Sequence, residues 1–116
     1  MATSVENNEN IFVFCDKISD NLIVFRKDKK DVWIDKYYVD PDNGKLFVML
    51  LKDSFEKMKQ KGCNTYMQYV DSDEWESFLK NISGWKILSR DNENNIILIS
   101  CTIDDAPICI TNGLLK

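Results

Sequence analysis

The hydrophobic period of the sequence changes abruptly at Lys45, and this change constrains the fold more than any other feature. From there on, apolar side chains recur at spacings of three and four residues, which places them on one face of an amphipathic helix. Asp42 or Asn43 can cap the start of this helix, and Gly62 can end it. We therefore predict a helix over residues 45–61 that packs one face on a core. The apolar face comprises Phe47, Leu50, Leu51, Phe55 and Met58.

Short runs rich in β-branched and aromatic residues stand on both sides of this helix, separated by turn-forming residues. A capping-box pattern at Asp71 predicts a second, shorter helix that ends near Ser83. We therefore expect an α/β (α+β) fold, with a mixed, mainly antiparallel central sheet and two helices. Residues 1–10 are expected to form a flexible arm and residues 11–116 a single domain. The predicted strands are residues 11–15, 21–25, 32–39, 65–70, 85–88 and 96–101, with 108–110 as a last edge strand.

Composition and charge exclude several classes of function. The chain has 116 residues, of which 44% are hydrophobic, enough for one core and hardly for two. Its formal net charge of −4 argues against nucleic acid or an anionic membrane as partner, because both attract an excess of basic residues. The longest apolar run, residues 46–51, is far shorter than the roughly 20 residues that span a bilayer. We expect a cytoplasmic location.

Reactive side chains are sparse. The chain has no histidine, which removes His-based triads, imidazole bases and most zinc or iron sites. Its four cysteines show neither the CxxC spacing of a redox pair nor that of a zinc ribbon, so we interpret them as small core residues. Cys63 in particular has no neighbouring base to activate it as a nucleophile.

Four acids cluster at the start of the second predicted helix. Acids in a first turn are expected for capping and for the helix dipole, so this explanation is preferred to a divalent-cation site. The acids are Asp71, Asp73, Glu74 and Glu76. The sequence therefore predicts no catalytic, cofactor-binding or metal-binding residues, and no cofactor.

Three motifs follow one another along most of the chain. The first is the strand of residues 34–41, which ends in Val39-Asp-Pro41; the second is the helix from Gly44 to the turn Lys61-Gly-Cys63. The third is the segment of residues 75–85, with Phe78 followed later by Gly84-Trp85. In this order and spacing, residues 11–101 resemble the GNAT N-acetyltransferase superfamily.

The resemblance implies a glycine-rich turn whose backbone N–H groups, at the start of the central helix, bind the diphosphate of acyl-CoA. The usual loop carries Arg or Gln and further glycines, whereas only Asp42 and Asn43 stand between Pro41 and Gly44 here. The carboxylates of Asp40 and Asp42 would in addition repel a diphosphate. We therefore expect no acyl-CoA to bind in the family's manner.

The resemblance also implies a general acid, usually a tyrosine next to the phenylalanine of the second helix. Leu79 follows Phe78 at that place, so the tyrosine that would act as general acid is absent from this position. The family's N-terminal helices are missing ahead of residue 11 as well, which should leave one face or edge of the sheet uncovered. The remaining tyrosines, which we interpret as packing residues of strands, are Tyr37, Tyr38, Tyr66 and Tyr69.

These observations favour a trimmed GNAT-like domain that serves as a non-catalytic binding or assembly module. The Asn-, Lys-, Asp- and Ile-rich composition, with Arg26 and Arg90 as the only arginines, is typical of an A+T-rich genome, as in many phages, large DNA viruses and some bacteria. Together with the family resemblance, because inactive acetyltransferase-like proteins occur in tailed-phage virions, it implies a structural virion component of a tailed phage, found in the host cytoplasm or the virion. Two alternatives stay open: an acyl-CoA-dependent N-acetyltransferase with an atypical cofactor loop, and a small adaptor or inhibitor of a host protein. As partner we expect another protein or a second copy of the chain, with residues 108–115 contributing to the contact.

Overall fold

The computed structural model describes residues 3–8, 10–79 and 84–114, and this part of the chain forms seven strands and three helices. The strands are β1 (Thr3–Asn8), β2 (Ile11–Cys15), β3 (Leu22–Asp28), β4 (Asp31–Tyr38), β5 (Thr65–Asp71), β6 (Lys86–Asp91) and β7 (Ile96–Thr102). The helices are α1 (Gly44–Gln60), α2 (Ser72–Leu79) and α3 (Ala106–Leu114). None of these described helices is long and apolar enough to cross a membrane.

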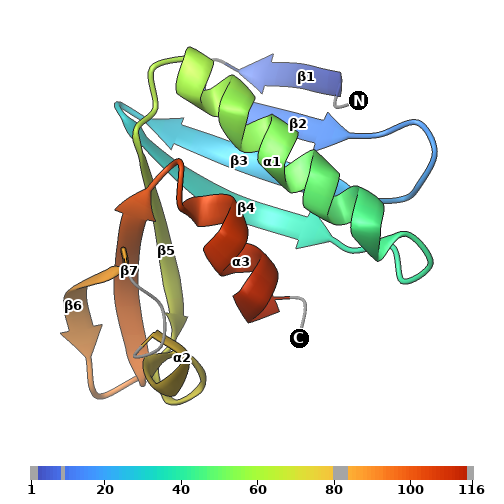
Figure 1. The fold of residues 1–116 in the computed structure, drawn as a ribbon. Helices are drawn as coiled ribbons and strands as arrows, with labels where there is room; N and C mark the ends of the chain where they lie inside the picture. The colour runs from blue at the N-terminus through green and yellow to red at the C-terminus, as the bar shows by residue number, and fades with distance from the viewer. Residues whose placement is uncertain (1–2, 9, 80–83, 115–116) are drawn as a thin grey trace.

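All seven strands belong to one sheet, in the order β1-β2-β3-β4-β5-β7-β6 (Figure 1). Neighbouring strands are antiparallel except β4 and β5, which are parallel. Parallel neighbours require a crossover connection, and α1 provides it. The predicted mixed, mainly antiparallel sheet is therefore confirmed.

Helix α1 lies across β2 and β3 and buries the face that its hydrophobic period predicted (Figure 1). Phe55 lies near the centre of this layer, with its ring centroid 4.7 Å from that of Phe25 and 5.5 Å from that of Tyr66. The ring of Phe14 continues the row, 5.8 Å from Phe25. The predicted helix is confirmed, and its buried residues are Phe47, Leu50, Leu51, Ser54, Phe55 and Met58.

A second, smaller core cluster joins α2 to β5 and β7. Trp85 packs against both clusters, with its ring centroid 6.1 Å from Trp75 and 6.0 Å from Tyr66. Tyr66 of the large cluster and Val70 of the small one lie an even number of residues apart on β5, and so point to the same face of the sheet. All three helices therefore pack on one face. The small cluster consists of Val70, Trp75, Ile97 and Ile99.

No helix of the described chain covers the opposite face of the sheet. Trp33 and Tyr69 stack on this face with ring centroids 5.6 Å apart, and the Arg26 guanidinium lies 5.1 Å from the Trp33 ring. Tyr69 is 62% exposed. An uncovered face agrees with the expectation from sequence, and the protein partner expected on it stays a prediction.

The N-terminal residues differ from the prediction of a flexible arm over residues 1–10. The structure places β1 there, antiparallel to β2 with Val5 opposite Val13. The sequence of this strand, TSVENN, is almost wholly polar. Such a composition is typical of a sheet edge and carries no alternating apolar pattern by which the strand could be recognised.

The C-terminal prediction is also incorrect, because residues 108–110 lie in α3 and not in an edge strand. Asp105 stands just before the helix and Pro107 lies in its first turn, where the missing N–H of proline breaks no helical bond. The side chains of Ala106 and Ile110 are fully buried, so packing outweighs the β propensity of the isoleucines. The described chain therefore has one helix more than predicted. The predicted end of the second helix near Ser83 lies outside the described residues.

Candidate active site

The two parallel strands β4 and β5 pair over only a short stretch at one end. Asp31, Val32 and Trp33 of β4 lie opposite Thr65, Tyr66 and Met67 of β5. Both strands continue beyond this stretch, β4 to Tyr38 and β5 to Asp71, and their ribbons diverge (Figure 1). We call the region where the two strands are no longer paired, with residues 34–38 of β4 on one side and 68–71 of β5 on the other, the wedge.

A β-bulge in β4 stands where the strands separate. Val24 of β3 is opposite Lys36, while the next residue, Phe25, is opposite Ile34, so that Asp35 has no partner in the ladder. A bulge bends its strand and increases the local twist, which turns the end of β4 away from β5. Backbone N–H and C=O groups on the wedge side of both strands are consequently left without a neighbouring strand. Such groups can bind an extended ligand by main-chain hydrogen bonds.

The N-terminus of α1 is open. Asn43 precedes the helix but makes no side-chain cap; its Nδ2 instead donates to Asp40 Oδ2, at 2.9 Å. The first turn contains no acidic residue, and Lys45 stands there although the helix dipole alone disfavours a cation at this end. A Cβ added to Gly44 would meet no atom within 4 Å. Unpaired N–H groups, a lysine and free space together suit an anionic ligand.

The carboxylate of Asp40 is turned into the loop that precedes α1. It accepts hydrogen bonds from the backbone N–H of Asp20 and of Asp42, each at 3.0 Å, as well as from Asn43. These hydrogen bonds, of which the one from the Asp20 N–H contributes most, hold the pKa of Asp40 below its ordinary value. These neutral donors stabilise the charged form of Asp40, so the carboxylate stays anionic, but its oxygen atoms are bound within the loop.

Asn21 holds this loop in place, and sequence analysis missed it. Its Oδ1 accepts from the Asp40 backbone N–H at 2.7 Å, and its Nδ2 donates to the Asn43 carbonyl at 3.0 Å. The side chain is buried, with 1% of its surface exposed. A polar residue at the start of an otherwise apolar predicted strand was the signal in the sequence.

The four tyrosines fall into different environments. Tyr66 is fully buried; burial raises its pKa well above the ordinary value, and its hydroxyl donates to Gln68 Oε1. It is a packing residue, as predicted. Tyr37 and Tyr38, at the end of β4, and Tyr69, on β5, are exposed. Tyr69 lies two residues beyond the last paired residue of β5 and thus at the wedge.

The remaining reactive residues have structural roles. Asp71 Oδ1 accepts from the backbone N–H of Asp73 at 2.9 Å and of Glu74 at 3.1 Å, which is the capping interaction that the sequence predicted. Among the residues whose positions are described, no three acids or cysteines are grouped as metal ligands. Cys63 is buried, and this burial raises the pKa of its thiol.

A sheet of this order, split between its two parallel strands and crossed by a helix from the split, is the fold of the GNAT N-acetyltransferases. The resemblance seen in the sequence is thus confirmed for the fold. No protein-family model matches the sequence, and no curated protein sequence matches it.

Individual solved structures make the likeness specific. The ribosomal-protein-S18-alanine N-acetyltransferase from Escherichia coli superposes with a TM-score of 0.56 at 14% identity, over 84% of this chain and 72% of that one. Aminoglycoside 6′-acetyltransferase type Ii gives a TM-score of 0.58 at 15% identity, over 83% of this chain and 71% of that one. A GNAT-family N-acetyltransferase (YhbS) from Escherichia coli in complex with CoA gives 0.50 at 16% identity, over 84% and 61%. At such identities the likeness establishes the fold alone.

The prediction of a non-catalytic binding or assembly module is wrong. The similar structures are acetyltransferases, which favours the alternative interpretation of the sequence. The prediction gave too much weight to missing side chains in the loop before Gly44, whereas the structure retains the split sheet and the open helix end. The comparisons give no support to a phage or virion setting.

Proposed function

We propose that the protein transfers an acyl group from acyl-CoA to an amine, as an N-acetyltransferase. The observation that carries the proposal is the open N-terminus of α1 directly after the diverging end of β4. The features of this end fit a diphosphate: it has no acid in the first turn, no side-chain cap, free space at Gly44 and a lysine at position 45. The proposal replaces the expectation that no acyl-CoA binds.

Most of the proposed chemistry depends on positioning by the backbone. The N–H groups of Gly44, Lys45 and Leu46 lie in the first turn of α1 and would hold the diphosphate, with help from the helix dipole. The unpaired backbone edge of β4 beyond Trp33 would pair with the amide groups of the pantetheine arm. Acyl-CoA supplies an activated thioester, and alignment of a thioester with an amine is by itself a large source of rate enhancement.

Tyr69 is our candidate for the proton donor to the leaving thiolate sulfur. It replaces the tyrosine that the sequence lacks at Leu79, and its position on β5 is at the wedge and accessible to solvent. An amine would approach from the uncovered face, on which Tyr69 stacks with Trp33. A hydroxyl within reach of the sulfur would contribute as a general acid.

The proposal is tested by calorimetric titration of the protein with CoA. In the variant Lys45→Glu, a carboxylate in the first turn of α1 faces the diphosphate, and we expect the affinity to fall at least about tenfold. Lys52→Glu, the same charge change at an exposed position farther along α1, is the matched control and should change the affinity less than about threefold. Equal effects of the two substitutions would show that CoA binds elsewhere or only through net charge.

A further inference from the structure

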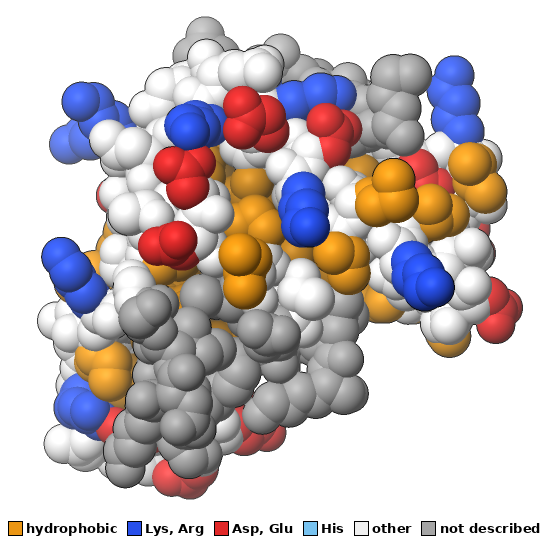
Figure 2. Space-filling view, in the orientation of Figure 1, with side chains coloured by type: hydrophobic (Ala, Val, Ile, Leu, Met, Phe, Trp, Pro, Cys, Tyr) orange, Lys and Arg blue, Asp and Glu red, His pale blue; other side chains and the backbone are white. Residues whose placement is uncertain are grey.

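Helix α3 lies where a ligand would enter the wedge from the α1 side. It packs against α1 and belongs to the same face of the sheet. In Figure 1 it stands between α1 and α2, in front of the diverging ribbons of β4 and β5. In Figure 2, in the same orientation, hydrophobic side chains gather beside the charged side chains that cover α1.

The buried face of α3 packs on the main core cluster, beside the wedge. Ala106 and Ile110 are fully buried, and they belong to one core cluster with Tyr66 of β5 and Phe47 of the first turn of α1. Ile34, the first residue of β4 beyond the paired stretch, packs against the same cluster. Ala106 and Ile110 of α3 thus share one core cluster with the paired end of β5 and the open end of α1, and Ile34 of β4 packs against this cluster.

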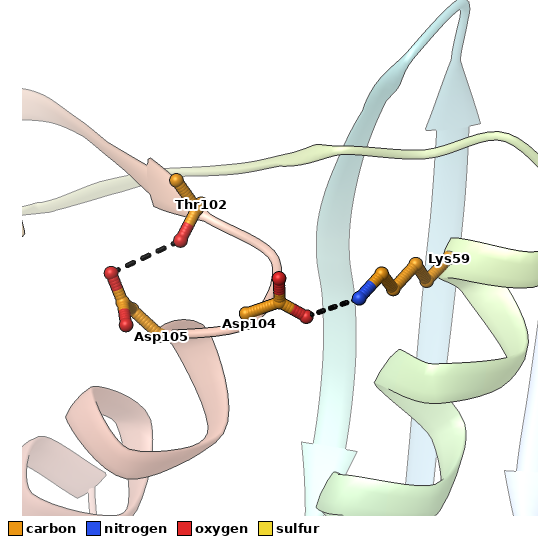
Figure 3. A network of polar contacts seen from close by, with 4 residues as sticks. All are labelled: Lys59, Thr102, Asp104 and Asp105. Atoms are coloured by element: carbon orange, nitrogen blue, oxygen red, sulfur yellow. Dashed lines mark hydrogen bonds and ion pairs between the residues drawn. The ribbon is translucent and has the colours of Figure 1, made fainter.

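The polar contacts described between α3 with its approach and the rest of the protein lie in the turn before the helix. Lys59 Nζ of α1 lies 2.7 Å from Asp104 Oδ1, and the Thr102 hydroxyl donates to Asp105 Oδ2 at 3.0 Å (Figure 3). Within α3, the described side-chain hydrogen bond is internal, from the Thr111 hydroxyl to the Pro107 carbonyl at 2.7 Å. The described side chains of the helix thus contact the rest of the protein by apolar packing. The turn before the helix is held to α1 by the ion pair between Asp104 and Lys59.

The helix itself has little intrinsic stability. It has nine residues, fewer than an isolated helix needs to persist in water. Three of them, Ile108, Ile110 and Thr111, are β-branched and lower helix propensity. Among its described side chains, those that hold it on the core by burial are Ala106, Pro107 and Ile110.

We propose that α3 is a lid over the wedge, which closes the α1 side in the free protein and swings away at residues 102–105 when acyl-CoA enters. This inference rests on the proposed function and adds regulation to the same site. A binding-competent state that is only partly populated weakens the apparent affinity by that fraction. A substitution that loosens the closed lid should therefore tighten CoA binding while it lowers the stability of the fold.

The test compares two isoleucine-to-alanine variants by calorimetric titration with CoA. Ile110→Ala removes the buried contact of the lid, and Ile97→Ala makes the same deletion in the small core cluster, away from α3. We expect Ile110→Ala to lower the Kd for CoA at least about tenfold, and Ile97→Ala to leave it unchanged or raise it. An unchanged or higher Kd for Ile110→Ala overturns the lid.

A second variant covers the case in which Ile110→Ala does not fold. Asp104→Asn removes the ion pair with Lys59 at the surface without touching the core, and it should also lower the Kd, by a smaller factor. Hydrogen exchange gives an independent readout on the unmodified protein, since CoA should accelerate exchange of the amides in residues 106–114. Slower or unchanged exchange, in a protein that binds CoA, overturns the lid alone. Absence of CoA binding in the unmodified protein and in both lid variants overturns the proposed function and the lid with it.

Discussion

Substitution of Asn21 by alanine should destabilise the fold and loosen the loop that leads into α1. The change removes the acceptor of the buried Asp40 N–H, at 2.7 Å, and one of the two donors to the Asn43 carbonyl, at 3.0 Å. That carbonyl keeps the Phe47 N–H, at 3.2 Å, whereas the Asp40 N–H keeps no other partner among the hydrogen bonds described for it. The larger part of the loss in folding stability therefore comes from the Asp40 N–H, a buried donor left without an acceptor.

The magnitude follows from these two bonds. A net hydrogen bond contributes about 0.5–1.5 kcal/mol, and a buried group left unsatisfied costs about 1–3 kcal/mol. We expect Asn21→Ala to lower the free energy of unfolding by about 2–4 kcal/mol. At this chain length each kcal/mol lowers the Tm by about 4 °C, which gives a decrease of roughly 8–16 °C.

The assay is urea denaturation followed by tryptophan fluorescence, together with titration with CoA. Asn94→Ala is the control, because Asn94 also donates from Nδ2, to Asp91 Oδ2 at 2.8 Å, but in an exposed turn. It should change the free energy of unfolding by less than about 0.5 kcal/mol. If Asn21→Ala is as mild as this control, or binds CoA as tightly as the unmodified protein, Asn21 does not organise the helix end.

Two further predictions concern catalysis and pH. In a steady-state assay with acetyl-CoA and an amine substrate, Tyr69→Phe should lower kcat at least about tenfold and leave the KM for acetyl-CoA nearly unchanged, because only the proton donor is removed. A fall in binding instead of kcat would assign Tyr69 to packing. The pKa of Asp40 is lower in the folded state than its ordinary value of 3.8, so its charge adds stability above that pH, and this is lost as the pH falls toward the lower native pKa. Asp40→Asn should therefore weaken the loss of stability in acid, which denaturation curves between pH 6 and 2 would measure; an unchanged acid transition would contradict this.

Helical and apolar strand patterns were sufficient to predict most of the fold. The period that starts at Lys45 predicts α1 to within one residue at either end, and Thr65 begins β5 as predicted. Prediction succeeded for helices and strands that bury one face, because such elements need apolar residues at regular spacings, and these spacings are visible in the sequence. It failed for β1, whose edge position needs no apolar alternation, and for α3, where tertiary packing overrides the β propensity of isoleucine.

The site was less predictable than the fold, for a physical reason. The bulge at Asp35 and the short pairing of β4 with β5 are relations between strands, and no single strand sequence encodes them. Backbone N–H groups at the start of α1 exist whatever side chains surround them, so the missing Arg or Gln of the loop was weak evidence against an anion site. Asp40 keeps the negative charge that the sequence assigns to it, and only the structure shows that its oxygen atoms are bound by three donors of the loop.

The short parallel pairing also bears on how the chain folds. The strands β1 to β4 are joined in sequence by antiparallel pairing, and β5 to β7 form a second antiparallel group. Their union depends on three residue pairs, against seven between β5 and β7, and on the core cluster that both groups share. The junction with the fewest paired residues is the easiest to open, so the line between β4 and β5 should behave as the boundary between two cooperative units. The wedge, where we place the proposed active site, would then lie at the part of the native structure that opens most easily.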